Sequence, residues 1–338
     1  MIRRQSLFLA LAAFALMAAP AFGAAAAKAP DKVRFGLDWK AEAEDGGYYQ
    51  AIATGIYARH GLDVALRQGG PQVNQAELLV AGRLDFTESA NSFIALNFVH
   101  QNIPMLAVAA MFQKDPQVLI AHAGHGYKSL ADLKGHPIMI GSDTRVGSWL
   151  FLKARFGFTD AQIRPYAFSV APFLVNPDAV QQGYVSSEPF LILKAGQKPK
   201  VFLLADEGYT SYGAVIETSR KLADTRPDLV RRFIDATIEG WYSYLYGDPA
   251  PADALIKRDN PEMTDALLAY GRGVLKSHGI VDSGDALHAG IGAMTAARWQ
   301  DFFQVMAKEG LYPATMDFTR AYTLRFVNHR AGMPAPGR

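Results

Sequence analysis

Strand-like and helix-like segments alternate along the first two thirds of this sequence. The strand-like runs are short and apolar and lie at 33–37, 62–66 and 84–87. Between them, the segments 47–59 and 74–81 carry apolar residues at helical spacing. Alternation of this kind favours mostly parallel sheets with helices packed on their faces.

The alternation restarts after residue 116 and then gives way to helices. Further strand-like runs lie at 118–121, 137–140, 201–204 and 214–216. Beyond them the pattern is almost entirely helical, with Pro227, Thr264 and Thr295 at expected helix starts. At 338 residues the chain is long enough for two compact units. We therefore expect two α/β units and a helical C-terminal region.

The first residues have the pattern of a secretory signal peptide. Arg3 and Arg4 precede an apolar run over 7–19, and Pro20 and small residues follow it. The apolar run is shorter than the roughly 20 residues that a membrane-spanning helix needs. We therefore expect residues 1–23 to be removed and the mature protein to be exported to the periplasm.

Charge and cysteine content exclude several classes of protein. The chain has 34 Lys and Arg against 32 Asp and Glu, and loss of the two signal-peptide arginines would bring the net charge to about zero. No block of like charge is present, which disfavours a nucleic-acid partner. Because the chain has no Cys, it has no disulfide, no thiolate metal site and no Cys nucleophile.

Common catalytic signatures are also missing. The sequence has no GxSxG elbow, no HExxH motif, no phosphate loop ending in GK[ST] and no GxGxxG after a strand. His122 and His125 are close in sequence, yet no third ligand stands at a matching spacing, so we predict no metal site. We also predict no cofactor and no catalytic residues.

Polar and aromatic residues gather at the ends of the expected strands, where open α/β sheets bind ligands. Four segments qualify, at 38–49, 88–92, 141–149 and 186–189. The candidate ligand-binding residues in them are Trp39, Glu44, Tyr48, Glu88, Asn91, Asp143, Thr144 and Glu188. Each segment taken alone is equally consistent with a helix cap or a turn.

Taken in order, several short strings resemble one protein family. They are Trp39 with 46–51, then 55–64, Gly69 to Pro71, 78–86, 129–135 and Glu188 with Pro189. In this order and spacing, the chain from Val33 to about Val327 resembles the substrate-binding proteins of nitrate, sulfonate and taurine type ABC importers. It is most similar to their thiamine-pyrimidine branch, which is related to hydroxymethylpyrimidine synthase.

The resemblance implies a type II periplasmic binding protein with two α/β lobes and a hinge. One lobe would span 31–114 plus 217–328 and the other 115–216, with the hinge near Gln113 and Ile216. A small heteroaromatic ligand, such as a thiamine pyrimidine precursor, would bind between the lobes without being chemically changed. In the pyrimidine branch, an aromatic side chain stacks on the ring and acidic side chains accept its amino hydrogens. The matching positions here are Trp39 and Glu188.

The same resemblance implies a monomeric receptor that delivers its ligand to an ABC permease in the inner membrane. The chain departs from many family members at Glu42, Glu44 and Asp45, whose charge would repel nitrate or a sulfonate. It also lacks the Cys-rich motif of the fungal enzymes in this family. Two alternatives stay open. One is the same scaffold binding a sulfonate or another small organic molecule, and the other is a secreted enzyme using Glu44, Glu88 or Glu188 as acid and base.

Overall fold

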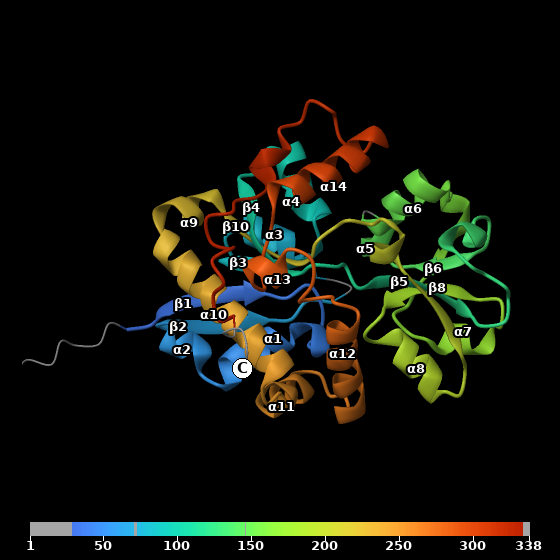
Figure 1. Ribbon diagram of the computed structural model, residues 1–338, viewed down its shortest axis with the longest axis horizontal. Coiled ribbons are helices and arrows are strands. Elements are labelled where there is room, and N and C mark those ends of the chain that lie inside the picture. Colours follow the sequence, from blue (N-terminus) through green and yellow to red (C-terminus); the bar gives the residue numbers. More distant parts are fainter. Residues whose placement is uncertain (1–28, 71–72, 146, 334–338) are drawn as a thin grey trace, which may run out of the picture.

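The computed structural model describes residues 29–70, 73–145 and 147–333. The predicted signal peptide, 1–23, lies outside these residues. Two five-stranded sheets form the centres of two lobes, which lie side by side in Figure 1. The expectation of two α/β lobes with a helical C-terminal region therefore matches the observed architecture.

The first sheet has the strand order β2-β1-β3-β10-β4. Its strands are β1 (Asp31–Gly36), β2 (Leu62–Arg67), β3 (Phe86–Asn91), β4 (Met105–Phe112) and β10 (Gly213–Ser219). The second sheet has the order β7-β6-β8-β5-β9. Its strands are β5 (Gln117–His122), β6 (Ile138–Ile140), β7 (Ile163–Pro165), β8 (Val180–Tyr184) and β9 (Pro199–Leu203).

Each sheet contains one strand that runs against the others, so both sheets are mostly parallel, as expected. β10 is antiparallel to β3 and β4, and β5 is antiparallel to β8 and β9. Both are the first strands after the chain crosses from one lobe to the other. A strand that enters from the neighbouring lobe starts at the shared edge, where the other strands end. The carboxyl ends of the remaining strands therefore meet between the lobes.

The lobe limits drawn from the sequence remain a prediction. Because β10 pairs with β3 and β4 from Gly213 onward, we propose that the first lobe resumes at residue 213 rather than 217. A second difference concerns β3, which was expected to end at Thr87 but continues to Asn91. The cause is its pairing with β10, which places Glu88 opposite Ile216 and Ser89 opposite Val215.

Helices cover both sheets, and they are shorter in the second lobe. The first part of the chain forms α1 (Gly46–Ala53), α2 (Ile56–Arg59), α3 (Gln75–Val80) and α4 (Phe93–His100). The second lobe holds α5 (Ser142–Arg145), α6 (Ser148–Phe156), α7 (Ala171–Val175) and α8 (Glu188–Lys194). The C-terminal region forms α9 (Arg220–Thr225), α10 (Pro227–Tyr246), α11 (Ala250–Asp259), α12 (Asp265–Ser277), α13 (Ala286–Ala289) and α14 (Ala296–Lys308).

The helix starts predicted for the C-terminal region are confirmed at three positions. Pro227 opens α10, the Thr264 side chain accepts a hydrogen bond from Leu267 N, and the Thr295 side chain accepts one from Arg298 N. The expected helix over 47–59 is instead divided at Gly55, whose φ of 70° takes the chain out of the helical conformation. No helix in the described part of the chain combines the length and apolar character needed to cross a membrane.

Candidate functional site

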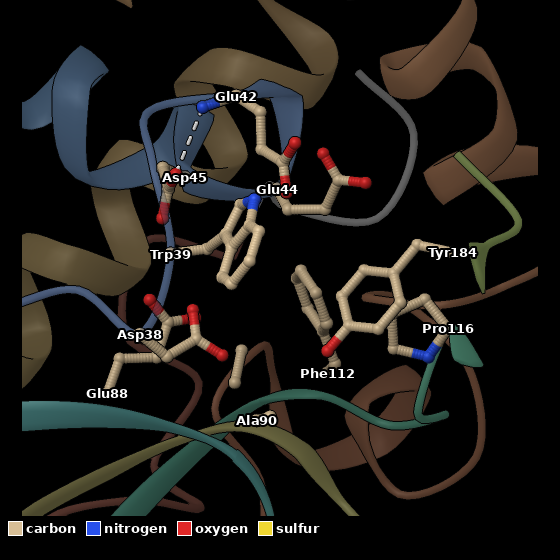
Figure 2. Close-up of a pocket in the computed structure, with 11 residues that line it drawn as sticks. Asp38, Trp39, Glu42, Glu44, Asp45, Glu88, Ala90, Phe112, Pro116 and Tyr184 are labelled. Atoms are coloured by element: carbon tan, nitrogen blue, oxygen red, sulfur yellow. Dashed lines mark hydrogen bonds between the residues drawn. The ribbon is translucent and has the colours of Figure 1, made fainter. Parts of the chain in front are cut away.

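A pocket lies where the two lobes meet, with about 300 Å³ of space between its atoms, part of it open to solvent. The first lobe supplies most of its wall and the second supplies Pro116 and Tyr184 (Figure 2). The other lining residues are Asp38, Trp39, Glu42, Glu44, Asp45, Glu88, Ala90, Phe112 and Ala214. Several of these residues lie at or beyond the carboxyl ends of β1, β3, β4 and β8, as expected for a ligand site in open α/β sheets.

Paired glycines hold the acidic loop, residues 42–45, in the pocket wall. A Cβ at Gly46 would lie 2.0 Å from the Tyr244 ring, and one at Gly47 would lie 2.3 Å from the Trp241 ring. Only glycine therefore allows α1 to pack this closely against α10. This packing holds the preceding 3-10 turn, η1 (Ala43–Asp45), against the body of the lobe and buries its acidic side chains.

The acidic loop is ordered by its own hydrogen bonds. Asp45 Oδ2 accepts a hydrogen bond from Glu42 N at 3.1 Å. Glu44 Oε1 accepts one from Ser186 Oγ, which belongs to the second lobe. The side chains of Glu44 and Asp45 are 7% and 2% exposed. The loop thus contributes to the pocket wall and contacts the opposite lobe.

Burial and mutual repulsion raise the pKa values of these carboxyl groups. Burial raises the pKa of Glu44 to about 7, with the charges of Glu188 and Asp38 acting in the same direction. The pKa values of Glu42, Asp45 and Glu88 are also raised, first by burial and then by their acidic neighbours. The lining residues include no Lys, Arg or His to offset this charge.

Aromatic rings form the remaining walls of the pocket. Figure 2 shows Trp39 and Tyr184 on either side of Phe112, with Glu42 and Glu44 above and Asp38 and Glu88 below. Trp39 and Tyr184 are half-buried, whereas Phe112 is buried against Trp241 with ring centroids 5.4 Å apart. The pocket wall therefore combines aromatic rings with carboxyl groups.

Four contacts join the lobes around the pocket, one of them being the bond from Ser186 to Glu44. The Trp39 ring lies 4.6 Å from that of Phe168, a second-lobe residue held at a φ of 53°. On α12, the Tyr270 hydroxyl donates to Val185 O at 3.3 Å, and its ring lies 5.1 Å from that of Phe190. The lobes are therefore in contact over the pocket in this structure.

The structure brings three of the predicted site residues into this pocket, namely Trp39, Glu44 and Glu88. Tyr48 lies behind Glu88, with its ring in the core against Phe35 at 5.0 Å. Asn91 caps the next turn, because its Oδ1 accepts from Phe93 N at 3.1 Å.

Three predicted residues belong to the second lobe, and two of them, Thr144 and Glu188, do not line the pocket. Thr144 is buried and its hydroxyl accepts from Gln117 Nε2 at 2.9 Å. Asp143 lies in α5, but its side chain is not among those that the structure describes. Glu188 begins α8, where Pro189 fits the first turn.

Glu188 binds groups of its own lobe. Its Oε1 accepts from the Tyr166 hydroxyl at 2.9 Å and its Oε2 from Tyr184 N at 2.7 Å. The carboxylate therefore supports Tyr184, a wall residue. Direct contact with a ligand, predicted for Glu188 from the resemblance, stays a prediction.

Sequence reasoning did not select several lining residues. Asp38, Glu42 and Asp45 stand in the segment that was singled out around Trp39, so their acidity was visible but their convergence was not. Phe112 and Tyr184 each end a strand, which is the only signal that could have identified them. Within the described residues, no group of three or more His, Asp or Glu side chains has the geometry to hold a metal ion.

Comparison with known proteins gives one family and one curated relative. The model of the NMT1/THI5-like family matches residues 43–252, which is more than half of the chain. The riboflavin-binding protein RibY of Chloroflexus aurantiacus is 25% identical over 322 residues, which cover 91% of each chain.

Solved structures share the fold at low sequence identity. The periplasmic aliphatic sulphonate binding protein SsuA of Escherichia coli aligns with a TM-score of 0.64 and 14% identity, covering 86% of this chain and 92% of that one. The alkanesulfonate-binding protein SsuA of Xanthomonas axonopodis pv. citri, bound to MOPS, gives 0.63 and 16%, covering 87% and 98%. The desulfurization enzyme DSZB gives 0.55 and 12%, covering 88% and 97%.

These matches confirm the resemblance drawn from the sequence strings and the two-lobed fold that it implied. The chain belongs to the NMT1/THI5-like family and has the periplasmic-binding-protein fold.

Proposed function

We propose that this protein is the solute-binding component of an ABC importer and closes its lobes around a small heteroaromatic ligand. The observation that carries the proposal is the inter-lobe pocket, which combines aromatic walls with carboxyl groups and has no basic lining residue. Such a site suits a flat ring with amino hydrogens, and a thiamine pyrimidine precursor has that chemistry. The receptor would act as a monomer in the periplasm and deliver its ligand to an inner-membrane permease.

A sulfonate is the ligand named for two structural neighbours, but this pocket is poorly suited to it. Five lining residues carry a carboxyl group: Asp38, Glu42, Glu44, Asp45 and Glu88. Repulsion between two unit charges 4 Å apart is about 1 kcal/mol in water and about 4 kcal/mol near a protein surface. A sulfonate would meet this repulsion at each close carboxyl group that is ionised, with no cation among the lining residues to compensate.

Riboflavin is the second candidate, because the curated relative that covers 91% of this chain is named as a riboflavin-binding protein. A flavin also offers a flat ring system and hydrogen-bond donors. The space of about 300 Å³ between the pocket atoms includes volume open to solvent, so it is an upper bound on what the lobes enclose in this arrangement. We favour a single-ring ligand for this reason, since three fused rings would require a wider separation of the lobes.

Catalysis is the alternative from another class. The desulfurization enzyme shares the fold, so the fold alone does not decide between binding and turnover. The sulfonate-binding neighbours have higher TM-scores, and this chain has no Cys that could act as a nucleophile. A binding role predicts that the ligand is recovered unchanged and in a stoichiometry of one after incubation.

Calorimetric titration of the mature protein tests the proposal. The probes are 4-amino-5-hydroxymethyl-2-methylpyrimidine, riboflavin and an aliphatic sulfonate. We expect tight one-to-one binding of the pyrimidine, with intact ligand found afterwards by mass spectrometry. Preference for riboflavin would show that the ligand is a flavin and not a pyrimidine. Preference for the sulfonate would refute the electrostatic argument. Conversion of a probe would refute the binding role.

A further inference from the structure

Glu88 is a buried carboxyl group with an unsatisfied oxygen at the pocket. It lies on β3, is 4% exposed and lines the pocket beside Asp38 (Figure 2). Its Oε2 accepts no hydrogen bond of good geometry among the described residues, and its nearest polar neighbour on the core side is the Tyr48 hydroxyl, which interacts with it only weakly. Buried polar atoms in native proteins are almost always satisfied, so an atom of this kind at a binding pocket indicates a donor supplied by the ligand.

Other buried carboxyl groups near the pocket are already engaged by the protein. Glu44 accepts from Ser186, Asp45 from Glu42 N, and Glu188 from Tyr166 and Tyr184. These bonds give each group a structural role. Glu88 Oε2 makes no such bond of good geometry in the described structure, which distinguishes it from these other carboxyl groups.

The charged groups that act on Glu88 are acidic. The negative charges of Asp38, Asp45 and Glu44 all act on it. Lys40, which follows Trp39 in the chain, is exposed and pairs with Glu262 at 3.1 Å instead of lining the pocket. A carboxylate cluster beside aromatic rings is the environment that binds an organic cation, because the rings add cation–π attraction to the ion pair.

We infer that the ligand enters this site as a cation whose protonated amine is held by Glu88 while its ring packs against Trp39. This inference rests on the proposed function and narrows it from a donor-bearing heteroaromatic to a positively charged one. It predicts that ligand charge, at constant shape, controls affinity. It also predicts that the preference for charge is lost when Glu88 alone is made neutral.

Two matched pairs of probes test the inference at pH 7. The first is 4-amino-5-aminomethyl-2-methylpyrimidine against its 5-hydroxymethyl analogue, in which an ammonium group replaces a hydroxyl of similar size. The second is benzylamine against benzyl alcohol, which asks the same question without the pyrimidine. An aliphatic amine is protonated at this pH. We expect each amine to bind at least about tenfold more tightly than its alcohol.

Two variants test whether Glu88 causes the preference for the amine over the alcohol. Glu88→Gln keeps the shape and should reduce the preference to less than about threefold. Glu217→Gln is the matched control, since Glu217 is an equally buried carboxyl on the adjacent β10, is bonded to Ser89 at 2.6 Å and does not line the pocket. It should retain the preference. Thermal unfolding checks that each variant is folded. The comparison of amine with alcohol in the wild-type protein does not depend on the variants.

Each outcome of these titrations supports or contradicts a named part of the two proposals. Equal or tighter binding of the hydroxymethyl pyrimidine would overturn the cation and leave the aminopyrimidine receptor intact. Binding of benzylamine over benzyl alcohol, with neither pyrimidine bound, would support the cation and refute the pyrimidine class. If no probe of either pair binds, both proposals fail. A preference that survives Glu88→Gln would refute the role of Glu88.

Discussion

Trp39 differs from the other tryptophans near the site because it is half-buried and lines the pocket. Trp241 is fully buried and contacts the rings of Tyr48, Phe112 and Tyr244. We therefore expect Trp39→Ala to weaken ligand binding on the order of tenfold while the protein stays folded, since ring stacking adds roughly 0.5–1.5 kcal/mol to the effect of area burial. Calorimetry and thermal unfolding measure the two effects separately.

Trp241→Ala is the contrasting variant. Removing a buried Trp costs about 3–5 kcal/mol of folding stability, so this variant should lose stability before any effect on binding can be assigned. Normal binding by Trp39→Ala, or a loss of stability comparable to that of Trp241→Ala, would show that Trp39 belongs to the core and not to the ligand site.

The raised pKa of Glu44 gives the ligand-free protein a pH dependence of definite sign. A carboxyl group whose pKa is about 7 when folded and 4.5 otherwise binds more protons in the folded state. Its contribution to stability is therefore complete below about pH 4.5 and is lost as the pH rises through 7. Asp115, raised to about 7, and Glu217, raised to about 8, act in the same direction.

We accordingly expect the melting temperature of the ligand-free protein to fall between pH 5 and pH 8. Glu44→Gln should flatten this slope, because the amide does not ionise. Glu262→Gln is the control, since Glu262 is exposed and pairs only at the surface with Lys40. A melting temperature that rises over this interval, or a slope unchanged in Glu44→Gln, would contradict the buried-carboxyl account.

Among the structural elements, α14 has a special position because it fixes both connections between the lobes. Arg298 Nε donates to Thr210 O at 3.0 Å and its Nη2 to Ser211 O at 3.2 Å, both just before β10. The same Nη2 donates to Gln113 O, where the chain leaves β4. One guanidinium group thus ties together the two segments that a hinge between the lobes would use.

Lysine cannot reproduce this fork of donors. Arg298→Lys should lower stability by about 1–3 kcal/mol through unsatisfied buried carbonyls and should increase the radius of gyration of the ligand-free protein in X-ray scattering. Arg325→Lys is the control, because Arg325 forms an exposed ion pair with Asp224 at 2.9 Å, and such pairs contribute little. If the stability and radius of gyration of Arg298→Lys are unchanged, α14 does not stabilise the hinge.

The order of elements followed from local patterns, but the shape of the site did not. Caps such as Thr264 and Thr295 act within one turn, so the sequence places them directly. By contrast, β3 extends through Glu88 only because β10, some 130 residues later, pairs with it. The burial of the acidic loop depends on the fit of Gly46 and Gly47 against α10, a contact that no local periodicity encodes.

For the whole molecule, the lobes touch across the pocket in this structure. Ligand contacts made by both lobes exist fully only in this arrangement, so we expect ligand to raise the melting temperature and to reduce the radius of gyration together. The contact between α12 and the second lobe offers a way to separate these effects. At Gly271, an added Cβ would lie 2.7 Å from Ala43 Cβ and 3.2 Å from Ser186 O.

Gly271→Ala should therefore displace either the acidic loop or the second lobe. Both displacements disturb the bond between Glu44 and Ser186, so ligand affinity should fall by about tenfold or more and the ligand-induced reduction in radius should diminish. Gly273 lies on the same helix, and a Cβ added there would have no atom within 4 Å. Gly273→Ala should therefore leave affinity unchanged and stabilise the helix by roughly 0.5–1 kcal/mol. Calorimetry and scattering on the two variants decide the matter. If Gly271→Ala binds and contracts as Gly273→Ala does, the contact between α12 and the second lobe is not required for binding or for closure of the lobes.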